Sequence, residues 1–429
     1  MGYQISPGVN VSEIDLTTVV PSVLTTAGAY VGAFKWGPAN KVILVDSEIT
    51  LASIFGQPDI YSVTSFHSAA NFLAYGNNLS VVRALGANHK NAVANVGSSI
   101  LIQNSDVYNA SYLFTLNNNK YGAFAARFPG NLGNSLSVVV IDTGNTARSD
   151  LFVSAPGTSS FVSQAGGAND EIHIAVVDTG GLFTGTKNTV LETYPFVSKA
   201  FDAINLNTGQ TNYYKQVITN QSKYILSMDP PDYQNTAPTW GMTSNTSFGS
   251  MFVPYNTISL YNGQDDIPTD ANTITGWSLF TNKETYDVSL LVTGAANTSV
   301  QQYVIDNIAN ARQDCVAFIS PPQSAVVNNV GNETSSIQNW LSNLGRSSSY
   351  VVADSGWKYQ YDVYNNIYGW VPLNADIAGL CVYTDSVTDP WYSPAGFNRG
   401  AIKNAIKLAW NPSKTYRDTL YAAGVNPVV

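Results

Sequence analysis

Charged residues are scarce in this chain. Asp, Glu, Lys and Arg together make up 11% of its 429 residues, against about 25% in an ordinary soluble protein. Because hydrophobic residues make up 44% and aromatic residues 12%, the scarcity does not indicate disorder, which combines low hydrophobicity with high net charge. Neutral polar side chains desolvate at lower cost than charged ones, so this composition favours a protein that buries much of its surface against copies of itself.

Long hydrophobic runs and cysteines are also few. No stretch approaches the ~18 uninterrupted apolar residues of a membrane span, and Met1–Leu16 has neither a basic leader nor an apolar run. We therefore expect a soluble, intracellular product without membrane insertion. The two cysteines, Cys315 and Cys381, lie far apart in apolar contexts, which indicates buried thiols rather than a disulfide or a nucleophile.

Enzyme signatures are absent from the sequence. It has no phosphate-binding loop, no Gly-x-Ser-x-Gly, no Cys-x-x-Cys and no His-Glu-x-x-His. His67, His89 and His173 are isolated from one another, which favours surface or hydrogen-bonded residues over metal ligands. The paired carboxylates Asp170-Glu171 and Asp265-Asp266 lie among turn formers, so loops are favoured over an acid/base pair. The sequence predicts no enzyme, no catalytic residue, no cofactor and no metal.

The net charge of -9 is unevenly distributed. From residue 390 onward the chain has one anion, Asp418, and five cations: Arg399, Lys403, Lys407, Lys414 and Arg417. This basic end is either a solvated helix face or a surface that meets an acidic partner or sister subunit. Nucleic acid is disfavoured as a partner by the sequence pI near 4.7.

Residues 1–22 have the pattern of an extended arm. Pro7 and Pro21 exclude a helix there, and polar residues alternate with apolar ones at the period of a strand. The apolar members are Val9, Val11, Ile14 and Leu16. Such an arm is either an edge strand of its own domain or a strand that adds to the sheet of a neighbouring subunit.

The rest of the chain changes character twice. Residues 23–86 and 264–429 alternate strand and helix patterns, which predicts one discontinuous α/β domain. Residues 87–263 show mainly period-two alternation, for example Leu136, Val138 and Val140, which predicts an inserted β-rich domain. The expected strands are residues 29–34, 79–85, 287–293, 315–319 and 350–353, and the expected helices are residues 66–73, 300–311, 337–344, 398–410 and 413–423. Gly76 is expected to end the first helix in a left-handed conformation, and Ser335 or Ser336 to cap the fourth.

Several short blocks of this sequence together form a distinctive pattern. In the last third they are Ala311–Cys315, Ser320–Pro322, Lys358–Asp362, Trp370–Leu373, Ala375–Gly379 and Ser393–Gly400. Near the start they are Ser6–Val9, Phe34–Pro38, Phe55–Pro58, Tyr75–Asn77 and Val81–Ala84, and near the end Arg417-Asp418, Leu420-Tyr421 and Asn426-Pro427. In this order the blocks resemble the contractile tail sheath proteins of T4-like bacteriophages.

The resemblance implies a structural subunit of the virion tail. It would assemble in the host cytoplasm as stacked hexameric rings around the tail tube and contract to drive the tube through the host envelope. Its partners would be copies of itself, the tube protein, and the baseplate and tail terminator proteins, with no nucleic acid. It also implies that Val9, Val11, Ile14 and Leu16 lie at a subunit interface. Arg399, Lys403 and Lys407, spaced four apart on the expected helix, would lie near the tube or the adjacent ring.

The sequence departs from the family in two places. The outward-projecting domain that the T4 protein inserts near the position of residues 83–91 is absent or much reduced, and the family's C-terminal segment beyond Asn426-Pro427 is not in this chain. The main alternative is the sheath of a non-phage injection apparatus, such as a pyocin or type VI system. An α/β hydrolase would need a nucleophile and base that the sequence does not offer, and a β-rich adhesion protein would lack the α/β half.

Overall fold

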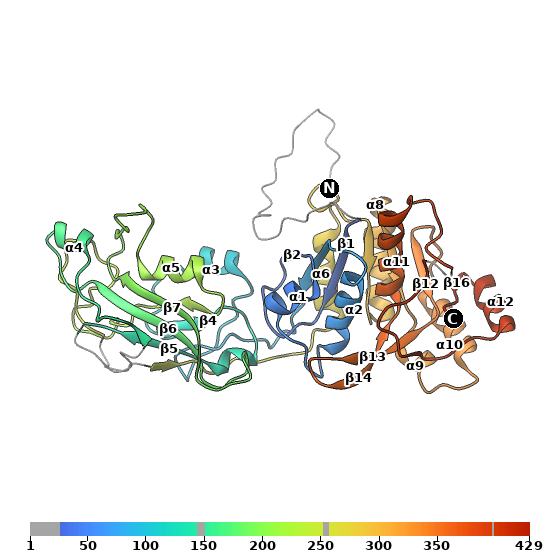
Figure 1. The fold of residues 1–429 in the computed structure, drawn as a ribbon, viewed down its shortest axis with the longest axis horizontal. Helices are drawn as coiled ribbons and strands as arrows, with labels where there is room; N and C mark the ends of the chain where they lie inside the picture. Colours follow the sequence, from blue (N-terminus) through green and yellow to red (C-terminus); the bar gives the residue numbers. More distant parts are fainter. Residues whose placement is uncertain (1–25, 144–150, 252–256, 397–398) are drawn as a thin grey trace, which may run out of the picture. The chain divides into compact units, whose positions relative to one another are not determined.

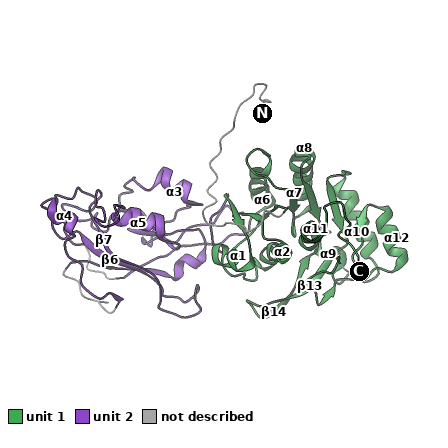
Figure 2. Ribbon diagram, turned by 45° about the horizontal axis from the view of Figure 1, so that its top comes forward, with its two compact units in different colours: residues 1–34, 40–84, 268–429 green, residues 35–39, 85–267 purple. Residues whose placement is uncertain are grey.

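The structure, a computed structural model, describes residues 26–143, 151–251, 257–396 and 399–429. Within these ranges the chain forms two compact units (Figure 2). Unit 1 contains the described residues up to Phe34 together with Asn40–Ala84 and Pro268–Val429, and unit 2 contains Lys35–Ala39 and Leu85–Ile267. No helix in the described part of the chain is long and apolar enough to cross a membrane. The predicted arm, residues 1–22, lies outside the described residues.

Unit 1 is built on a seven-stranded sheet (Figure 1). Its strands, in spatial order, are β16 (Val425–Asn426), β12 (Val351–Asp354), β11 (Val316–Ile319), β10 (Leu290–Val292), β1 (Gly28–Gly32), β3 (Leu79–Arg83) and β2 (Val42–Val45). Neighbouring strands are parallel except for β2, which is antiparallel to β3. The short apolar runs in β1, β3, β10 and β11 suit a parallel sheet because helices cover both of its faces.

The two faces of this sheet have separate cores. Tyr30 points into a core formed with α1 (Glu48–Phe55), α2 (Val63–Leu73) and α11 (Asn374–Val387). Its neighbours Ala29 and Val31 point into the opposite core, which contains Trp277 of α6 (Asp270–Trp277) and Val304 of α7 (Thr298–Val304). The alternation follows from the pleat of a strand, in which successive side chains face opposite sides.

The remaining helices of unit 1 include three that the sequence predicted, over 300–311, 337–344 and 413–423, and two that it did not, Ser278–Phe280 and Gln323–Val326. Three-residue η3 (Ser278–Phe280) follows α6, and a short π-helix, η4 (Ile305–Ala309), joins α7 to α8 (Asn310–Arg312). Then come α9 (Gln323–Val326), α10 (Glu333–Leu344) and α12 (Lys414–Ala422). The predicted helix 337–344 is confirmed within α10, but its N-cap is Asn332 rather than a serine. The predicted helix 413–423 is confirmed as α12, with Ser413 capping its first turn.

A second sheet in unit 1 has three antiparallel strands in the order β14 (Ile367–Pro372), β13 (Trp357–Asp362) and β15 (Lys407–Leu408). This sheet contradicts the predicted helix 398–410. Asn404 has a left-handed backbone, with φ of 55°, which a continuing α-helix does not allow. Residues 407 and 408 then pair with β13. The apolar stripe that suggested a helix was therefore outweighed by hydrogen bonding to an available strand edge.

Unit 2 contains a four-stranded antiparallel sheet in the order β7 (Thr189–Ser198), β6 (Glu171–Asp178), β5 (Leu136–Ile141) and β9 (Thr257–Ser259). A two-stranded pair, β4 (Phe124–Ala126) and β8 (Ile225–Ser227), lies beside it in the fold. Short helices, absent from the sequence prediction, are α3 (Ser105–Ser111), η1 (Asn131–Ser135), α4 (Ser160–Gln164) and α5 (Tyr214–Gln221). Their apolar residues, such as Tyr214 and Ile218, complete the core over the sheet.

The prediction for Gly76 was wrong. Helix α2 ends at Leu73 with Ala74 as its C-cap, and Gly76 does not adopt a left-handed conformation. A Cβ atom on Gly76 would instead lie 2.7 Å from Cγ1 of Val382. A Cβ on Gly379 would lie 2.4 Å from Cδ2 of Tyr75. Both glycines therefore permit the segment after α2 to lie close against α11.

Buried polar groups connect the elements of unit 1. The Nζ atom of Lys358 lies 2.9 Å from Oδ1 of Asp376, with both side chains 0% exposed. Burial raises the pKa of Asp376 and lowers that of Lys358, against the mutual attraction of the two charges. Asp354 is also buried at the end of β12, where it accepts hydrogen bonds from the Ser320 hydroxyl at 2.6 Å and the Gly356 N–H at 2.9 Å. Burial is the main cause that raises the pKa of Asp354 to about 7.

The substitution Asp354→Asn is expected to flatten the pH dependence of stability. The folded chain with Asp354 holds a proton up to about pH 7, whereas an unfolded aspartate loses it near about pH 3.9. The free energy of unfolding therefore falls as the pH rises between these values, by at most about 1.4 kcal/mol per pH unit, and levels off above the folded pKa. Asparagine cannot ionise and lacks this contribution. Urea unfolding at several pH values would measure it, and identical pH slopes for both proteins would contradict it.

The substitution Gly379→Ala is expected to destabilise unit 1 by about 1–3 kcal/mol, because the added methyl group would overlap the Tyr75 ring. Gly369→Ala is the matched control, since a Cβ there would meet nothing within 4 Å. Thermal or urea unfolding of both variants would measure the difference. Equal stability of the two variants would show that the contact between α11 and Tyr75 is not tight.

Candidate assembly surfaces

His67 and His173 lie in separate buried hydrogen-bonding environments. His67 lies buried on α2, 3.2 Å from Oδ1 of Asp362, and burial lowers its pKa. His173 lies in β6, where its Nδ1 accepts the Phe196 N–H and its Nε2 lies 2.8 Å from the Ser154 carbonyl oxygen. No group of three or more His, Cys, Asp or Glu side chains within the described ranges could hold a metal ion.

The cysteines are poor nucleophiles. Cys315 is buried, and burial raises its pKa to about 12. Cys381 is half-buried, and burial raises its pKa to about 11. Because the thiolate is the reactive form, both side chains stay protonated and inert at neutral pH. The prediction of a buried, unpaired thiol is confirmed for Cys315, whereas Cys381 is unpaired but only half-buried.

The three cations predicted to share a helix face lie instead along an irregular segment that ends in β15. Each of them faces an aromatic ring. The guanidinium of Arg399 is 5.6 Å from the ring centre of Tyr392, and the Nζ atom of Lys403 is 4.7 Å from that of Tyr75. Lys407 lies 5.2 Å from the Tyr359 ring centre and 5.7 Å from that of Trp370. Such contacts hold a cation over the negative face of the ring.

Lys403 anchors this segment to the sheet domain. Its Nζ donates to the carbonyl oxygen of Ala74 at 2.6 Å, and its backbone N–H donates to the hydroxyl oxygen of Tyr75 at 2.7 Å. Its own carbonyl oxygen accepts a hydrogen bond from Nζ of Lys358 at 2.8 Å. Burial and the charge of Asp376 raise the pKa of Tyr75, so this hydroxyl stays neutral. Lys403 therefore has a structural role, whereas the neighbouring Lys407 is more available to a partner.

The second sheet presents an aromatic face. Tyr359 and Tyr361 of β13 stand opposite Trp370 and Tyr368 of β14, with ring centres 4.7 Å apart for the first pair and 5.0 Å apart for the second. Tyr361 and Tyr368 are 41% and 54% exposed. Lys407 pairs in register with Tyr359, so this face combines exposed aromatic rings with a cation.

The sequence analysis did not identify this face, although the alternation of aromatic residues along both strands was a usable signal. The alternating polar side chains, Gln360 and Asp362, are the buried ones. Gln360 accepts a hydrogen bond from the Asn71 side chain of α2 at 2.9 Å. Along β13 the aromatic side chains therefore become more exposed toward the end of the strand, from buried Trp357 through half-buried Tyr359 to exposed Tyr361.

Strand β14 is an edge of this sheet. It pairs with β13 on one side, and no described strand pairs with its other side. The exposed backbone of an edge strand is a template for an added strand from another chain. Val9, Val11, Ile14 and Leu16, the apolar residues of the predicted arm, lie outside the described residues.

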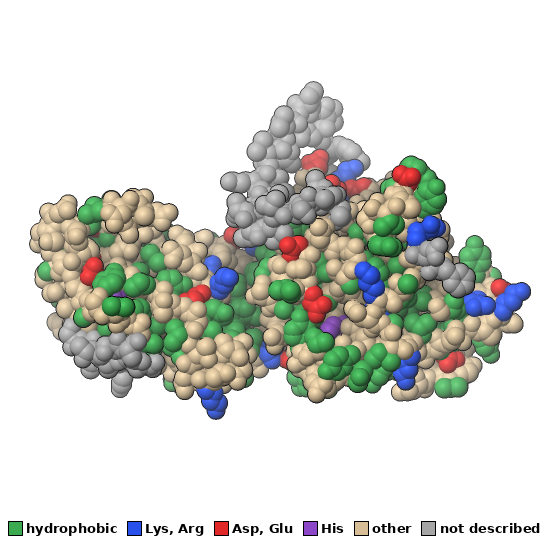
Figure 3. All heavy atoms as spheres, in the orientation of Figure 1, with side chains coloured by type: hydrophobic (Ala, Val, Ile, Leu, Met, Phe, Trp, Pro, Cys, Tyr) green, Lys and Arg blue, Asp and Glu red, His purple; other side chains and the backbone are tan. Residues whose placement is uncertain are grey.

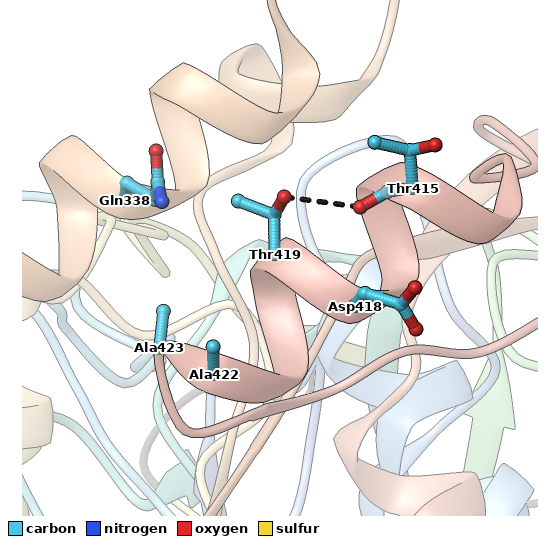
Figure 4. A pocket seen from close by; sticks show the side chains of 6 residues that line it. All are labelled: Gln338, Thr415, Asp418, Thr419, Ala422 and Ala423. Carbon is cyan, nitrogen blue, oxygen red and sulfur yellow. Dashed lines mark hydrogen bonds between the residues drawn. The ribbon is translucent and has the colours of Figure 1, made fainter.

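A groove also runs between α10 and α12 (Figure 4). It is a shallow, open groove of about 560 Å³, lined by Gln338 from α10 and by Thr415, Asp418, Thr419, Ala422 and Ala423 from the end of the chain. The Thr419 hydroxyl is occupied by a hydrogen bond to the carbonyl oxygen of Thr415 at 3.0 Å. Asp418 is the only ionisable residue in this lining, so the groove has no pair of ionisable side chains for acid–base catalysis.

Charged side chains are sparse on the face of the molecule seen in Figure 3. In the view of Figure 3, backbone and neutral polar side chains cover much of each unit, with isolated acidic and basic groups and small apolar areas between them. Surfaces of this kind can be buried against a partner without stripping water from many charges.

Two family models match the chain. The model described as phage tail sheath protein central domain matches residues 269–429, and the model described as tail sheath protein Gp18 domain III N-terminal region matches residues 25–84. Both matches fall within unit 1.

Individual tail sheath proteins match almost the whole chain. The tail sheath protein of Vibrio phage KVP40 is 29% identical over 99% of this chain and 80% of its own length. That of Enterobacteria phage T4 is 27% identical over 99% of this chain and 79% of its own length. The alignment with the KVP40 protein extends over 548 residues, so the relative carries insertions that this 429-residue chain lacks.

A solved structure shares the fold. The crystal structure of the sheath tail protein Lin1278 from Listeria innocua matches 95% of this chain and 66% of that chain, with a TM-score of 0.52 and 9% sequence identity. At this identity the likeness concerns the arrangement of mixed α/β elements and several sheets.

Proposed function

Since the chain belongs to the tail sheath proteins of T4-like phages and is a component of the virion tail, we propose that it forms stacked hexameric rings around a tail tube. Contraction of this cylinder drives the tube through the host envelope. The observation that carries the proposal is the likeness to phage tail sheath proteins, which extends over 99% of the chain. The partners are copies of the chain, the tube protein, and the baseplate and tail terminator proteins.

Contraction requires an energy source within the assembly, because a sheath protein is not an enzyme. The source is the difference in interface free energy between two packings of the same subunit. A gap of about a few kcal/mol per subunit is enough to make such a transition nearly complete, and it is multiplied over every copy. Neutral polar surfaces suit this role because subunits can exchange contacts without desolvating many charges.

In this proposal the two units correspond to different domains of a sheath subunit. Unit 1, with its seven-stranded sheet, is the α/β sheath core, and unit 2 is the inserted, sheet-rich domain. The family matches to both chain segments of unit 1 support this division. The predicted boundaries, 1–22, 23–86 with 264–429, and 87–263, are proposed on the same basis.

Residues 1–22 link subunits in this proposal. Val9, Val11, Ile14 and Leu16 would pair their strand with a neighbour's sheet, and the unpaired edge of β14 is a suitable recipient. Glu13 and Asp15 in the same arm complement the positive charge of Lys407 beside that sheet. A backbone ladder of this kind keeps subunits connected while the arm pivots at its prolines during contraction.

The basic segment, from Arg399 to Lys407, contacts the tube or the adjacent ring in this proposal. Arg399 and Lys407 supply the charge, and Lys403 fixes the segment to unit 1 through Ala74 and Tyr75. The support is the exposure of Lys407 beside the aromatic face of β13 and β14.

Deletion of residues 1–22 is expected to leave a folded monomer that does not polymerise, because the link between subunits is lost. Circular dichroism and thermal unfolding would establish the fold, and negative-stain microscopy would measure assembly. In the full-length chain, serine at Val9, Val11, Ile14 and Leu16 should have the same effect, whereas Asn10→Ala with Ser12→Ala should not. Intact sheaths from the deletion variant would contradict the proposal.

The substitution Lys407→Glu is expected to reduce assembly on tail tubes severalfold at low ionic strength. The defect should shrink at high salt, where the Debye length falls to about 3 Å. Lys414→Glu, which reverses an exposed cation on α12, is the control for a general effect of charge. Sedimentation of sheath-covered tubes over a series of salt concentrations would measure both. Unchanged assembly of Lys407→Glu at low salt would exclude the contact.

A further inference from the structure

Unit 2 contains a buried lysine and aspartate in unusually close contact. Lys199 directly follows β7, and Asp142 directly follows β5. The Nζ atom of Lys199 lies 2.5 Å from Oδ1 of Asp142, and the two side chains are 0% and 2% exposed. Charge-assisted N–H···O hydrogen bonds are about 2.7–2.9 Å long, so the amine nitrogen and the carboxyl group are in direct contact.

The surroundings of this pair are dry and aromatic. The Nζ atom lies 5.1 Å from the ring centre of Trp240, which belongs to the main core of unit 2. Its other hydrogen-bond partners are backbone carbonyl oxygens, those of Asn169 at 2.9 Å and Gly249 at 3.3 Å. The carboxyl oxygen that meets the amine also accepts the Thr143 N–H at 2.7 Å. These contacts hold both reacting groups in fixed positions.

Burial changes the protonation balance of the pair. It raises the pKa of the Asp142 carboxyl against the attraction of Lys199. It also lowers the pKa of the Lys199 amine, against the attraction of Asp142 and of two further buried carboxylates, Asp170 and Asp232. Both directions favour a neutral amine beside a neutral carboxylic acid. An uncharged amine has the free electron pair of a nucleophile, and a protonated carboxyl group can lose its hydroxyl as water.

We propose that Lys199 and Asp142 condense to form an intramolecular isopeptide bond. The Nζ electron pair attacks Cγ of Asp142, and an N–Cγ bond forms. The C–O bond to the carboxyl hydroxyl breaks, and this hydroxyl takes a proton from the nitrogen and leaves as water. The products are one amide and one water molecule, so the step needs no oxidant, reductant or cofactor. Fixed proximity of this kind replaces the encounter of two separate reactants.

The bond would join two strands that are not neighbours. In the four-stranded sheet, β6 lies between β5 and β7. The amide would therefore connect the end of β5 to the end of β7, across β6. A covalent link between residues 57 apart in sequence restricts the unfolded chain and stabilises the folded unit. It would also allow unit 2 to bear mechanical load without strand separation.

A second fully buried lysine–aspartate pair among the described residues is an internal comparison. In unit 1, Lys358 and Asp376 lie at 2.9 Å, within the normal range for a hydrogen-bonded ion pair. The same Asp376 oxygen also accepts the hydroxyl of Tyr75 at 3.1 Å. This pair is expected to remain two separate side chains.

Mass spectrometry of the purified full-length chain tests the proposal. The intact mass should be lower than the sequence mass by one water molecule. After denaturation and tryptic digestion, Lys199 should resist cleavage, and one branched peptide should join residues 128–148 to residues 188–215. Lys358 should appear only in unlinked peptides. An intact mass equal to the sequence mass, with free cleavage at Lys199, would overturn the proposal.

Variants give a second, independent measurement. Lys199→Arg keeps the positive charge but removes the nucleophilic amine, so the variant should regain the mass of one water molecule and lose the branched peptide. Lys358→Arg is the matched control and should retain the branched peptide. Persistence of the water loss in Lys199→Arg would place the dehydration elsewhere and exclude this bond. If Lys199→Arg does not fold, the peptide analysis of the unchanged chain still decides the question.

Discussion

The parallel pairing of β1 with β10 holds the largest unit of this protein together. Gly28 and Leu290 lie in register on adjacent strands, although most of the chain separates them. Parallel strands require a long connection, and here that connection contains β3 and all of unit 2 after Leu85. The strand pairing β1–β10 thus allows a second folding unit to be inserted without interrupting the sheet domain.

Because charged residues are scarce, the few buried ionic groups are important for holding segments of unit 1 in place. Most of the polar surface is neutral, which suits exchange of contacts between subunits. In contrast, Lys358, Asp376 and Tyr75 form a buried network that fixes the basic segment through Lys403. Removing one member of such a network leaves an uncompensated group in a dry interior, which costs far more than the loss of a surface ion pair. The buried ionic groups therefore fix the interior structure, whereas the neutral polar surface can exchange contacts between subunits.

Local sequence patterns predicted the secondary structure correctly where a segment's own residues decide it. The stripes that predicted α10 and α12 are confirmed, and so are the apolar runs of β3 and β11. They failed where a distant strand competed: the segment before Trp410 has a helical apolar stripe, yet it extends to pair with β13. The aromatic face of β13 and β14 was missed for a related reason. Only the position of α2 shows that Gln360 and Asp362 are the buried side.

The sequence by itself determined the class of this protein, because ordered motifs and periodic apolar residues are properties of the chain that need no partner to be recognised. It also determined the absence of known catalytic motifs and the alternation of the first 22 residues. Only the tertiary structure decided which residues meet. The close approach of Lys199 to Asp142 depends on the ends of β7 and β5 converging in one core. Such contacts arise from the folding of segments far apart in sequence, and no local pattern of side chains encodes them.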